Sequence, residues 1–243
     1  MQEVAAADVA AFFAPERPGP LIHAHVAATG VGRCSADGWP DPVTVTAELP
    51  GGNIAVRGAP APLAGLRGLI EAGPEWLPAL REVDRGVAAW PRLVSVLPPS
   101  SDVPAPVHPV RRLTPQDAAV IELLHPSIAW IGETWDGAAG LAASGHAWAA
   151  FVGDHPVAVA CSFYVGTRYE DIGVVTEPDH RGRGLSTACA AALITDIRRR
   201  RRQPSWTTSP DNAASRGVAA ALGFVHQRDD VLFAVGVPVP TVD

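Results

Sequence analysis

The pattern of apolar and polar positions is clearest between residues 108 and 236. Short apolar runs alternate there with segments of helical period, which is the order of a mixed α/β domain. The pattern predicts strands at 110–113, 147–152, 157–165, 169–176, 205–209 and 231–235, and helices at 114–124, 128–143 and 212–222. A further predicted helix opens at 181–186 and ends at 198–202. The centre of the 169–176 strand is an unbroken apolar run, so we expect this strand to be buried on both faces.

The first 105 residues carry weaker signals. The pattern predicts strands at 43–49, 54–57 and 92–97 and helices at 5–13, 63–71 and 76–83. Residues 21–28 are apolar, and if they form a strand, His23 and His25 share a face. That pair is either a structural one or part of a metal site. We expect a small α+β lobe here, and one alternative is that it is a degenerate half of the same fold as the C-terminal part.

A proline-rich stretch lies between these two regions. Residues 98–109 contain five prolines, which favour an extended connector over a helix or a strand. The sequence therefore predicts an N-terminal lobe at 1–105 and a second domain at 108–243.

Composition excludes several classes of protein. Of the 243 residues, 47% are hydrophobic and 18% charged, which describes a globular chain with a core. The formal net charge is −6 and neither half is basic, so we expect no nucleic-acid or membrane partner. The run Arg198–Arg202 is either a solvated helix end or a patch for an acidic partner.

The cysteines and the N-terminus bear on metal binding and location. Cys34, Cys161 and Cys189 are far apart without metal-ligand spacing, so we expect no metal, and the apolar surroundings of Cys161 and Cys189 predict core residues. The first ten residues lack the positive region of a signal peptide, and no apolar run is long enough to span a membrane. We therefore expect a cytoplasmic protein.

The most specific chemistry follows the 169–176 strand. After a short loop, the residues from Arg181 to Ser186 read Arg-Gly-Arg-Gly-Leu-Ser and open a helix. The first turn of a helix has unpaired backbone N–H groups and partial positive charge. Gly182 and Gly184 let a ligand approach the backbone, and two arginines add full charge. This combination predicts a phosphate-binding site.

Two motifs carry a family resemblance. Arg181-x-x-Gly184-x-Ser186 resembles the R/Q-x-x-G-x-G/A loop of the GNAT N-acetyltransferase superfamily, and the segment from Asn212 to Phe224 is similar to that family's Asn-led helix ending in Gly-Phe. The resemblance covers about residues 108–236. It implies a GNAT-type mixed central sheet flanked by helices, in an acyltransferase that moves an acetyl group from acetyl-coenzyme A to an amine.

The resemblance also implies which residues hold the cosubstrate. One group is expected to pair its backbone with the pantetheine arm, which requires the strand to splay from its neighbour at 205–209: Val174, Val175 and Thr176. A second group is expected to meet the pyrophosphate: Arg181, Gly182, Arg183, Gly184, Leu185, Ser186 and Thr187. Asn212 and Ser215 match positions near the distal arm of coenzyme A.

For catalysis the resemblance points to Glu170, at the position where some family members carry a glutamate base. Alternation places Glu170 on the face of Ile172 and Val174, and Asp171 on the other face. Flanking β-residues would raise the pKa of Glu170 by desolvation, whereas the alternative is a solvated residue at a strand start. The chain departs from the family at Ser186, a tolerated small residue, and at Ala219, where many members have a tyrosine that protonates the thiolate.

We expect the acceptor to bind in a pocket that is lined by aromatic side chains and contains an acidic residue. The candidates are Trp130, Glu133, Trp135 and Trp206, with Trp148 and Tyr164 as further members, and core packing is the alternative for each. A carboxylate among aromatics favours a cationic amine. The function expected is therefore N-acetylation of a small-molecule amine by a monomer or homodimer. The alternatives are a peptide or protein N-acetyltransferase, which an open groove would favour, and a non-catalytic coenzyme A-binding protein, which Ala219 favours.

Overall fold

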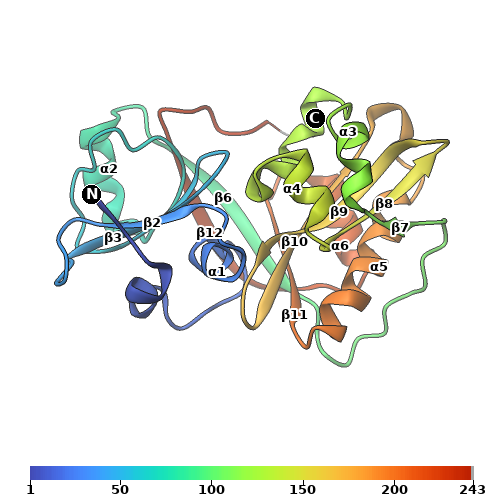
Figure 1. Cartoon of the computed structure of the whole chain (residues 1–243), viewed down its shortest axis with the longest axis horizontal. Coiled ribbons are helices and arrows are strands. Elements are labelled where there is room, and N and C mark those ends of the chain that lie inside the picture. Colours follow the sequence, from blue (N-terminus) through green and yellow to red (C-terminus); the bar gives the residue numbers. More distant parts are fainter. Residues whose placement is uncertain (242–243) are drawn as a thin grey trace.

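A single mixed sheet of twelve strands runs through both halves of the chain in the computed structural model, which describes residues 1–241 (Figure 1). The strand order is β1-β2-β3-β4-β5-β12-β6-β11-β10-β9-β8-β7. The strands are β1 (Gln2–Val4), β2 (Arg33–Ala36), β3 (Thr44–Leu49), β4 (Asn53–Gly58), β5 (Gly68–Glu71), β6 (Ala88–Val96), β7 (Arg111–Arg112), β8 (Ala147–Val152), β9 (His155–Val165), β10 (Tyr169–Thr176), β11 (Gln203–Thr208) and β12 (Val225–Val235).

Helices flank this sheet. The α-helices are α1 (Ile22–Thr29), α2 (Leu77–Val83), α3 (Ala118–Ile121), α4 (Ala138–Ala143), α5 (Leu185–Arg199) and α6 (Ala213–Ala221). Short 3-10 helices, labelled η, are η1 (Ala6–Phe13), η2 (Pro74–Trp76), η3 (Pro115–Asp117), η4 (Pro126–Trp135) and η5 (Pro178–His180). Among residues 1–241, no helix is long and apolar enough to cross a membrane.

The C-terminal half has the predicted mixed arrangement. Strands β7 to β10 are antiparallel neighbours, and β10 pairs in parallel with β11. Helix α5 packs on one face of these strands, while α3, α4 and η4 cover the other. Strand β10 is therefore buried on both faces, as expected, and so is β9. Cys161 and Cys189 are buried core residues, as the sequence predicts, and Cys34 is buried as well.

The two halves exchange strands at the centre of the sheet. Strand β6, from the N-terminal half, lies between β11 and β12 and pairs antiparallel with both. Strand β12, from the end of the chain, pairs antiparallel with β5 as well. A division of the chain at residue 105 therefore does not divide the sheet, and Figure 1 shows β6 and β12 crossing together between the halves.

The N-terminal half repeats the strand arrangement of the C-terminal half. Strands β2, β3 and β4 are antiparallel, β4 and β5 are parallel, and β12 follows antiparallel, as β8, β9, β10, β11 and β6 do on the other side. The connection between β4 and β5 is the loop at 59–67, where the C-terminal half has the glycine-rich loop and α5. In the described chain, only the C-terminal half therefore has a long helix between its parallel strands.

One element prediction in the first half is wrong, and one stretch whose structure the pattern left open is a helix. Residues 63–71 were expected to be helical, but Gly65 and Gly68 have positive φ angles of 80° and 142° that interrupt a helix, and residues 68–71 pair with β4 and β12. The 21–28 stretch is helix α1 and not a strand, because its buried residues Ile22, His25 and Val26 have helical spacing.

Polar contacts fix the N-terminal half against the C-terminal half. The imidazole of His25 is fully buried, its Nε2 lies 2.9 Å from the carbonyl oxygen of Thr134, and its Nδ1 accepts from the N–H of Val165 at 3.0 Å. Burial lowers the pKa of His25 to about 4. Since both ring nitrogens are engaged in these bonds, His25 has a structural role and is no metal ligand.

A second contact joins the halves at the β9–β10 turn. The carboxylate of Glu16 accepts hydrogen bonds from the backbone N–H groups of Thr167, Arg168 and Tyr169 and from the Thr167 hydroxyl, at 2.7–2.9 Å. These bonds hold the turn that leads into β10, the strand beside which the candidate site lies.

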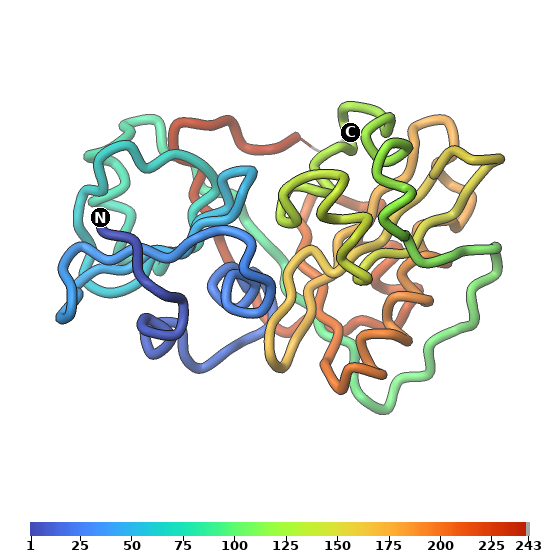
Figure 2. Tube along the Cα trace, in the orientation of Figure 1, coloured from blue at the N-terminus to red at the C-terminus, as the bar shows by residue number. Residues whose placement is uncertain are grey.

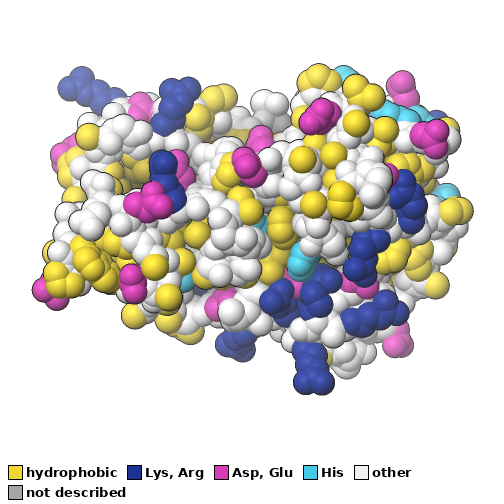
Figure 3. Space-filling model, viewed as in Figure 1, with side chains coloured by type: hydrophobic (Ala, Val, Ile, Leu, Met, Phe, Trp, Pro, Cys, Tyr) yellow, Lys and Arg dark blue, Asp and Glu magenta, His cyan; other side chains and the backbone are white. Residues whose placement is uncertain are grey.

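The arginine run at the end of α5 is more than a solvated helix end. Arginine side chains gather over this part of the surface (Figure 3), yet Arg200 and Arg202 turn inward to Glu170. Arg198 donates to the carbonyl oxygens of Ser101 and Pro98, which ties the proline-rich connector to α5. The connector itself carries no helix or strand over residues 97–110 and runs around the outside of the C-terminal half (Figure 2).

Candidate active site

The candidate site begins where two parallel strands separate. Strands β10 and β11 pair only over Tyr169–Asp171 with Gln203–Ser205, although both continue beyond this point. From residue 172 to 176, β10 forms no pair with β11 in the described chain, while it remains paired with β9 on its other edge. The expected splay is therefore present, and it leaves one backbone edge of β10 open to a ligand.

The glycine-rich loop closes one end of this opening. Gly182 and Gly184 adopt left-handed conformations with φ of 73° and 75°, which favour glycine, and Gly184 caps the N-terminus of α5. A Cβ on Gly182 would meet nothing within 4 Å, and one on Gly184 would meet only His108 at 3.7 Å. The space in front of the loop is therefore open, and the unpaired N–H groups of the first turn of α5 border it.

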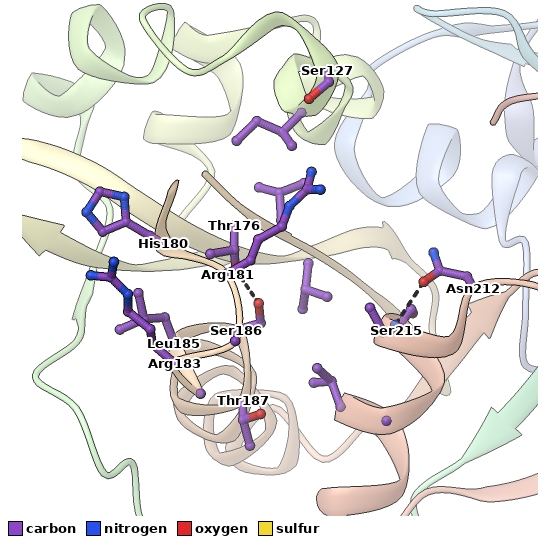
Figure 4. A pocket seen from close by; sticks show the side chains of 18 of the residues that line it. Ser127, Thr176, His180, Arg181, Arg183, Leu185, Ser186, Thr187, Asn212 and Ser215 are labelled. Atoms are coloured by element: carbon purple, nitrogen blue, oxygen red, sulfur yellow. Dashed lines mark hydrogen bonds between the residues drawn. The ribbon is translucent and has the colours of Figure 1, made fainter. Parts of the chain in front are cut away.

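A cleft of about 490 Å³ lies against the open edge of β10, the loop and α6. All twelve residues expected to hold the cosubstrate line this cleft: Val174, Val175, Thr176, Arg181, Gly182, Arg183, Gly184, Leu185, Ser186, Thr187, Asn212 and Ser215. Figure 4 shows the side chain of Arg181 reaching across the cleft toward Ser127, with Arg183 and His180 on the far side of the loop.

Hydrogen bonds within the cleft fix its walls. The hydroxyls of Thr176 and Ser186 bond to each other, which joins β10 to the first turn of α5 (Figure 4). At the opposite wall, Asn212 Oδ1 caps α6 by accepting from the N–H of Ser215 at 2.9 Å. Ser186, a departure from the family motif, is thus accommodated by a strand-to-helix contact.

A second cavity of about 540 Å³ adjoins the cleft. Six residues line both spaces: Ser127, Trp130, Val174, Asn212, Ser215 and Thr241. Its other walls come from both halves of the chain, with Asn53, Leu69, Trp90 and Arg92 from the first half and Phe163, Tyr164, Asp171 and Thr207 from the second. The segment after β12 returns from the N-terminal half to the C-terminal half (Figure 2), and Pro240 and Thr241 complete the lining.

Asp171 is the acidic residue at the point where the strands separate. Its Oδ1 accepts from the hydroxyls of Ser205 at 2.7 Å and Thr207 at 3.0 Å, and among the described residues no hydrogen bond reaches Oδ2. Burial raises the pKa of Asp171 to about 7, against the opposing effect of the two hydroxyls and Arg92. A carboxylate with this pKa accepts and releases a proton near neutral pH, as a general base requires.

The expectation that Glu170 is the base is wrong. Its side chain is fully buried, does not line the cleft or the cavity, and pairs with Arg200 at 2.6 Å and Arg202 at 3.0 Å. Burial alone would raise the pKa of Glu170, but hydrogen bonds from His146, Arg200 and Ser162 outweigh it and hold that pKa well below the usual range. Glu170 is therefore a structural anchor for the end of α5.

Most of the expected substrate residues lie around the second cavity. Trp130, Glu133 and Trp206 line it, as does Tyr164, whose hydroxyl donates to Asn53 Oδ1 at 2.9 Å. Burial raises the pKa of Glu133 above its usual range.

Two of the tryptophans do not reach the site. Trp135 is 6% exposed, packs its ring on His146 and donates its Nε1–H to the Ser162 carbonyl, so its prediction is wrong. Trp148 donates to Asp196 beside α5 and also lies outside the cavity. Trp135 is a core residue and Trp148 is a partly buried residue packed against the core, and core packing was the alternative for every aromatic in the set.

Ser215 lies at the junction of the two spaces. Its Oγ accepts the Nε1–H of Trp206 at 2.9 Å, which leaves the hydroxyl proton available to donate. Ala219, one turn further along α6, is 7% exposed and belongs to the core, so the position of the family tyrosine carries no hydroxyl. Ser215 is thus the hydroxyl of α6 that both spaces share.

The sequence did not reveal Arg92, Trp90 and Thr207 as site residues. Arg92 and Trp90 come from β6, which lies outside the stretch with the family resemblance, and only the strand exchange brings them to the cavity. A polar Thr207 on β11 was visible, but its bond to Asp171 depends on the register of β10 and β11.

Comparisons with known proteins identify a family of acetyltransferases. A family model described as GNAT acetyltransferase matches residues 112–231, which contain the glycine-rich loop and α6. The chain is 39% identical over 196 residues to an uncharacterized N-acetyltransferase in the mutA 5′ region of Streptomyces virginiae, covering 76% of this chain and 82% of that one.

Solved structures resemble the whole chain and not only its second half. A GCN5-related N-acetyltransferase-like protein from Streptococcus suis superposes with a TM-score of 0.73 at 18% identity, covering 94% of this chain and 97% of that one. A tandem GNAT protein from the clavulanic acid biosynthesis pathway gives a TM-score of 0.56 at 15% identity, covering 98% of each chain. At these identities the likeness is one of fold, and it extends over both halves.

Proposed function

The chain belongs to the GNAT acetyltransferase family, and from that premise we propose that it transfers an acetyl group from acetyl-coenzyme A to the amine of a small molecule. The observation that carries the proposal is the separation of β10 from β11. It starts directly after Asp171, and it opens the cleft at the glycine-rich loop toward the cavity that Asp171 lines.

The residues of the cleft fit acetyl-coenzyme A. The first-turn N–H groups of α5, with Arg181 and Arg183 beside them, suit a pyrophosphate, and the open edge of β10 over residues 172–176 suits the amides of a pantetheine arm. When bound, this cosubstrate supplies the acetyl group as a thioester and a thiol as leaving group. The residues thus fit the cosubstrate by charge, by hydrogen-bonding capacity and by their order along the cleft.

We assign the general base to Asp171. A substrate amine arrives mainly as an ammonium ion, which has no lone pair to attack a carbonyl carbon. Asp171 Oδ2 accepts one proton from it, the nitrogen then bonds to the acetyl carbon, and the bond from that carbon to sulfur breaks. The nitrogen loses a second proton as the amide forms, and this proton replaces the one that the leaving sulfur takes up. The raised pKa of Asp171, about 7, matches this task at neutral pH.

The hydroxyl of Ser215 is the proposed proton donor to the leaving sulfur. Its Oγ is held by the Trp206 N–H, and it lines both the cleft and the cavity. A thiol with a pKa near 8.5 also tolerates leaving as a thiolate, so this donor assists and is not indispensable. Ser215 thus takes the place of the tyrosine hydroxyl that is missing at position 219, where this chain has Ala219.

The second cavity favours a small amine over a peptide. Its walls come from both halves, and residues 240–241 complete its lining, whereas a peptide substrate requires an open groove. We further propose that the N-terminal half is a degenerate copy of the GNAT fold that supplies walls but no second cosubstrate site. The repeated strand order and the loop at 59–67, in place of a helix, support this view.

A panel of amines with acetyl-coenzyme A tests the proposal. We expect thiol release that depends on the amine, with the acetylated product identified by mass spectrometry. Peptides with free N-termini and lysines belong in the same panel. Acetylation of peptides alone would favour the protein-acetyltransferase alternative, and tight binding of acetyl-coenzyme A without turnover of any acceptor would favour the non-catalytic one.

A further inference from the structure

Arg92 is a cation on the wall of the second cavity that lacks a carboxylate partner. Its guanidinium lies over the Trp90 ring at 3.9 Å, and Nη2 donates to the Thr207 carbonyl at 3.3 Å. Its Nε is buried and has no hydrogen-bond partner, and no carboxylate among residues 1–241 lies within 4.0 Å of the guanidinium. Burial lowers the pKa of Arg92 to about 10, so the side chain is still charged at neutral pH.

Of the five other half-buried arginines among residues 1–241, four have carboxylate partners, and Arg198 donates to two backbone carbonyl oxygens. Arg57 pairs with Glu71 at 2.5 Å, Arg228 pairs with Asp230 at 2.8 Å, and both Arg200 and Arg202 pair with Glu170. A partly buried charge without a partner costs free energy, which is why proteins pair such groups. Arg92 has no carboxylate partner, and it lies on the wall of a cavity. An unpaired guanidinium beside a cavity points to an anionic group on the ligand.

The anion-binding group lies next to the proposed base. Thr207 joins the two, because its hydroxyl donates to Asp171 Oδ1 and its carbonyl oxygen accepts from Arg92. Each of these charges also affects the pKa of the other. The cavity therefore presents a carboxylate for an ammonium group and a guanidinium for an anion, with one residue between them.

We infer that the acceptor is a compact zwitterion, a small molecule that carries its amine and a carboxylate on one short skeleton, as amino acids do. The carboxylate binds the guanidinium of Arg92, the amine faces Asp171 Oδ2, and the remainder of the molecule packs on the aromatic walls at Trp130, Phe163 and Tyr164. This inference rests on the proposed function and names its substrate class.

Matched acceptors test the inference. We compare alanine, leucine and phenylalanine with their amides and with the corresponding decarboxylated amines, measuring thiol release with acetyl-coenzyme A. For the preferred skeleton, kcat/KM should be at least tenfold higher for the amino acid than for its amide. In Arg92→Gln the ratio of kcat/KM for the amino acid to kcat/KM for its amide should fall to less than about threefold.

Two further variants control this comparison. Arg92→Lys keeps the charge without the planar fork and should keep part of the preference, which makes the test independent of whether Arg92→Gln folds well. Arg168→Gln removes an exposed arginine outside both spaces and should leave the preference unchanged. Thermal unfolding of each variant verifies that it is folded.

A binding measurement separates this inference from the acetyltransferase proposal. By calorimetry in the presence of coenzyme A, the wild type should bind the preferred amino acid at least tenfold more tightly than its amide, and Arg92→Gln should lose that difference. Equal or better use of the amides would overturn the zwitterion inference and leave the acetyltransferase proposal standing. Amino-acid binding that depends on Arg92 but is never followed by turnover would support the inference and contradict the proposal. Absence of both binding and turnover for every amino acid would overturn the inference.

Discussion

At the scale of single residues, two neighbouring carboxylates on β10 have opposite environments. Glu170 faces the end of α5, where two arginines hold it ionised, and Asp171 faces the second cavity, where burial raises its pKa to about 7. Adjacent positions on a strand point to opposite faces, so one strand provides both a structural anchor and a candidate base. Pairs of acids whose environments separate their pKa values commonly divide such roles.

Replacing Asp171 by Asn should remove the base while leaving the cosubstrate site intact. We expect Asp171→Asn to lose about 10²-fold or more in turnover, the usual range for general acid–base catalysis, with unchanged affinity for acetyl-coenzyme A. In the wild type, kcat/KM should rise with pH through about 7, because the base must be ionised to accept a proton. That rise should be absent in the variant, and its deficit should shrink at high pH, where the amine is already deprotonated in solution.

Glu170→Gln is the matched control for Asp171→Asn. It removes one charge from the adjacent position and leaves Arg200 and Arg202 without their carboxylate, so we expect a loss of stability, about 3 kcal/mol in urea unfolding. Its pH–rate profile should follow that of the wild type. A profile that loses its rise near pH 7 in Glu170→Gln and keeps it in Asp171→Asn would reverse the two assignments.

The residue-scale prediction from sequence was correct about the faces and wrong about the function. Alternation correctly placed Glu170 with Ile172 and Val174, which lie on the α5 side, and Asp171 on the opposite side. Which of the two faces holds the acceptor cavity depends on where β6 and the first half of the chain lie. That information is not present in the local pattern around residue 170.

At the scale of elements, the unit formed by β10, the glycine-rich loop and α5 was predictable. Its determinants are local: an apolar strand, two glycines in left-handed conformations and a helix rich in alanine. All twelve cosubstrate residues inferred from the resemblance line one cleft for the same reason. The helix predicted at 63–71 was wrong, because residues 68–71 form a strand that pairs with β4 and β12. These long-range pairings override the apparent helical period of the segment.

The loop predicts a specific loss of cosubstrate affinity in Gly184→Glu. This change places bulk and negative charge where a pyrophosphate is expected, so affinity for acetyl-coenzyme A should fall more than tenfold, or more than about 1.4 kcal/mol. Gly153→Glu is the control, because Gly153 also has a positive φ, 57°, with open space around it, but lies in the β8–β9 turn outside the cleft. Calorimetry showing equal affinity in both folded variants would exclude the loop as the phosphate site.

At the scale of the whole molecule, the exchange of β6 and β12 makes the acceptor cavity a property of both halves. Neither strand could be assigned its neighbours from sequence, because each pairs with partners more than a hundred residues away. The proline-rich connector suggested two separate domains, whereas the sheet is continuous across them. The cavity, Arg92 and Trp90 follow from this long-range arrangement.

His25 should make the union of the two halves sensitive to acid. Burial lowers its pKa to about 4 in the folded protein, against about 6.5 in an unfolded chain. Between these values the unfolded chain binds a proton that the folded protein does not, so stability falls as pH falls from 6.5 to 4. Between pH 7.5 and 4.5 the wild type should lose roughly 2–3 kcal/mol of unfolding free energy from this residue alone, and His25→Gln should show a correspondingly smaller loss in urea unfolding. Equal losses in the two proteins would show that His25 titrates normally.

A crystal structure with coenzyme A bound would show whether the cosubstrate enters the gap between β10 and β11. We expect the pyrophosphate at the N–H groups of residues 182–187, the pantetheine arm along the open edge of β10 over residues 172–176, and the thiol at the junction of the two spaces, near Ser215 and Asp171. A structure in which β10 and β11 close against each other, or in which coenzyme A binds elsewhere on the chain, would contradict this expectation.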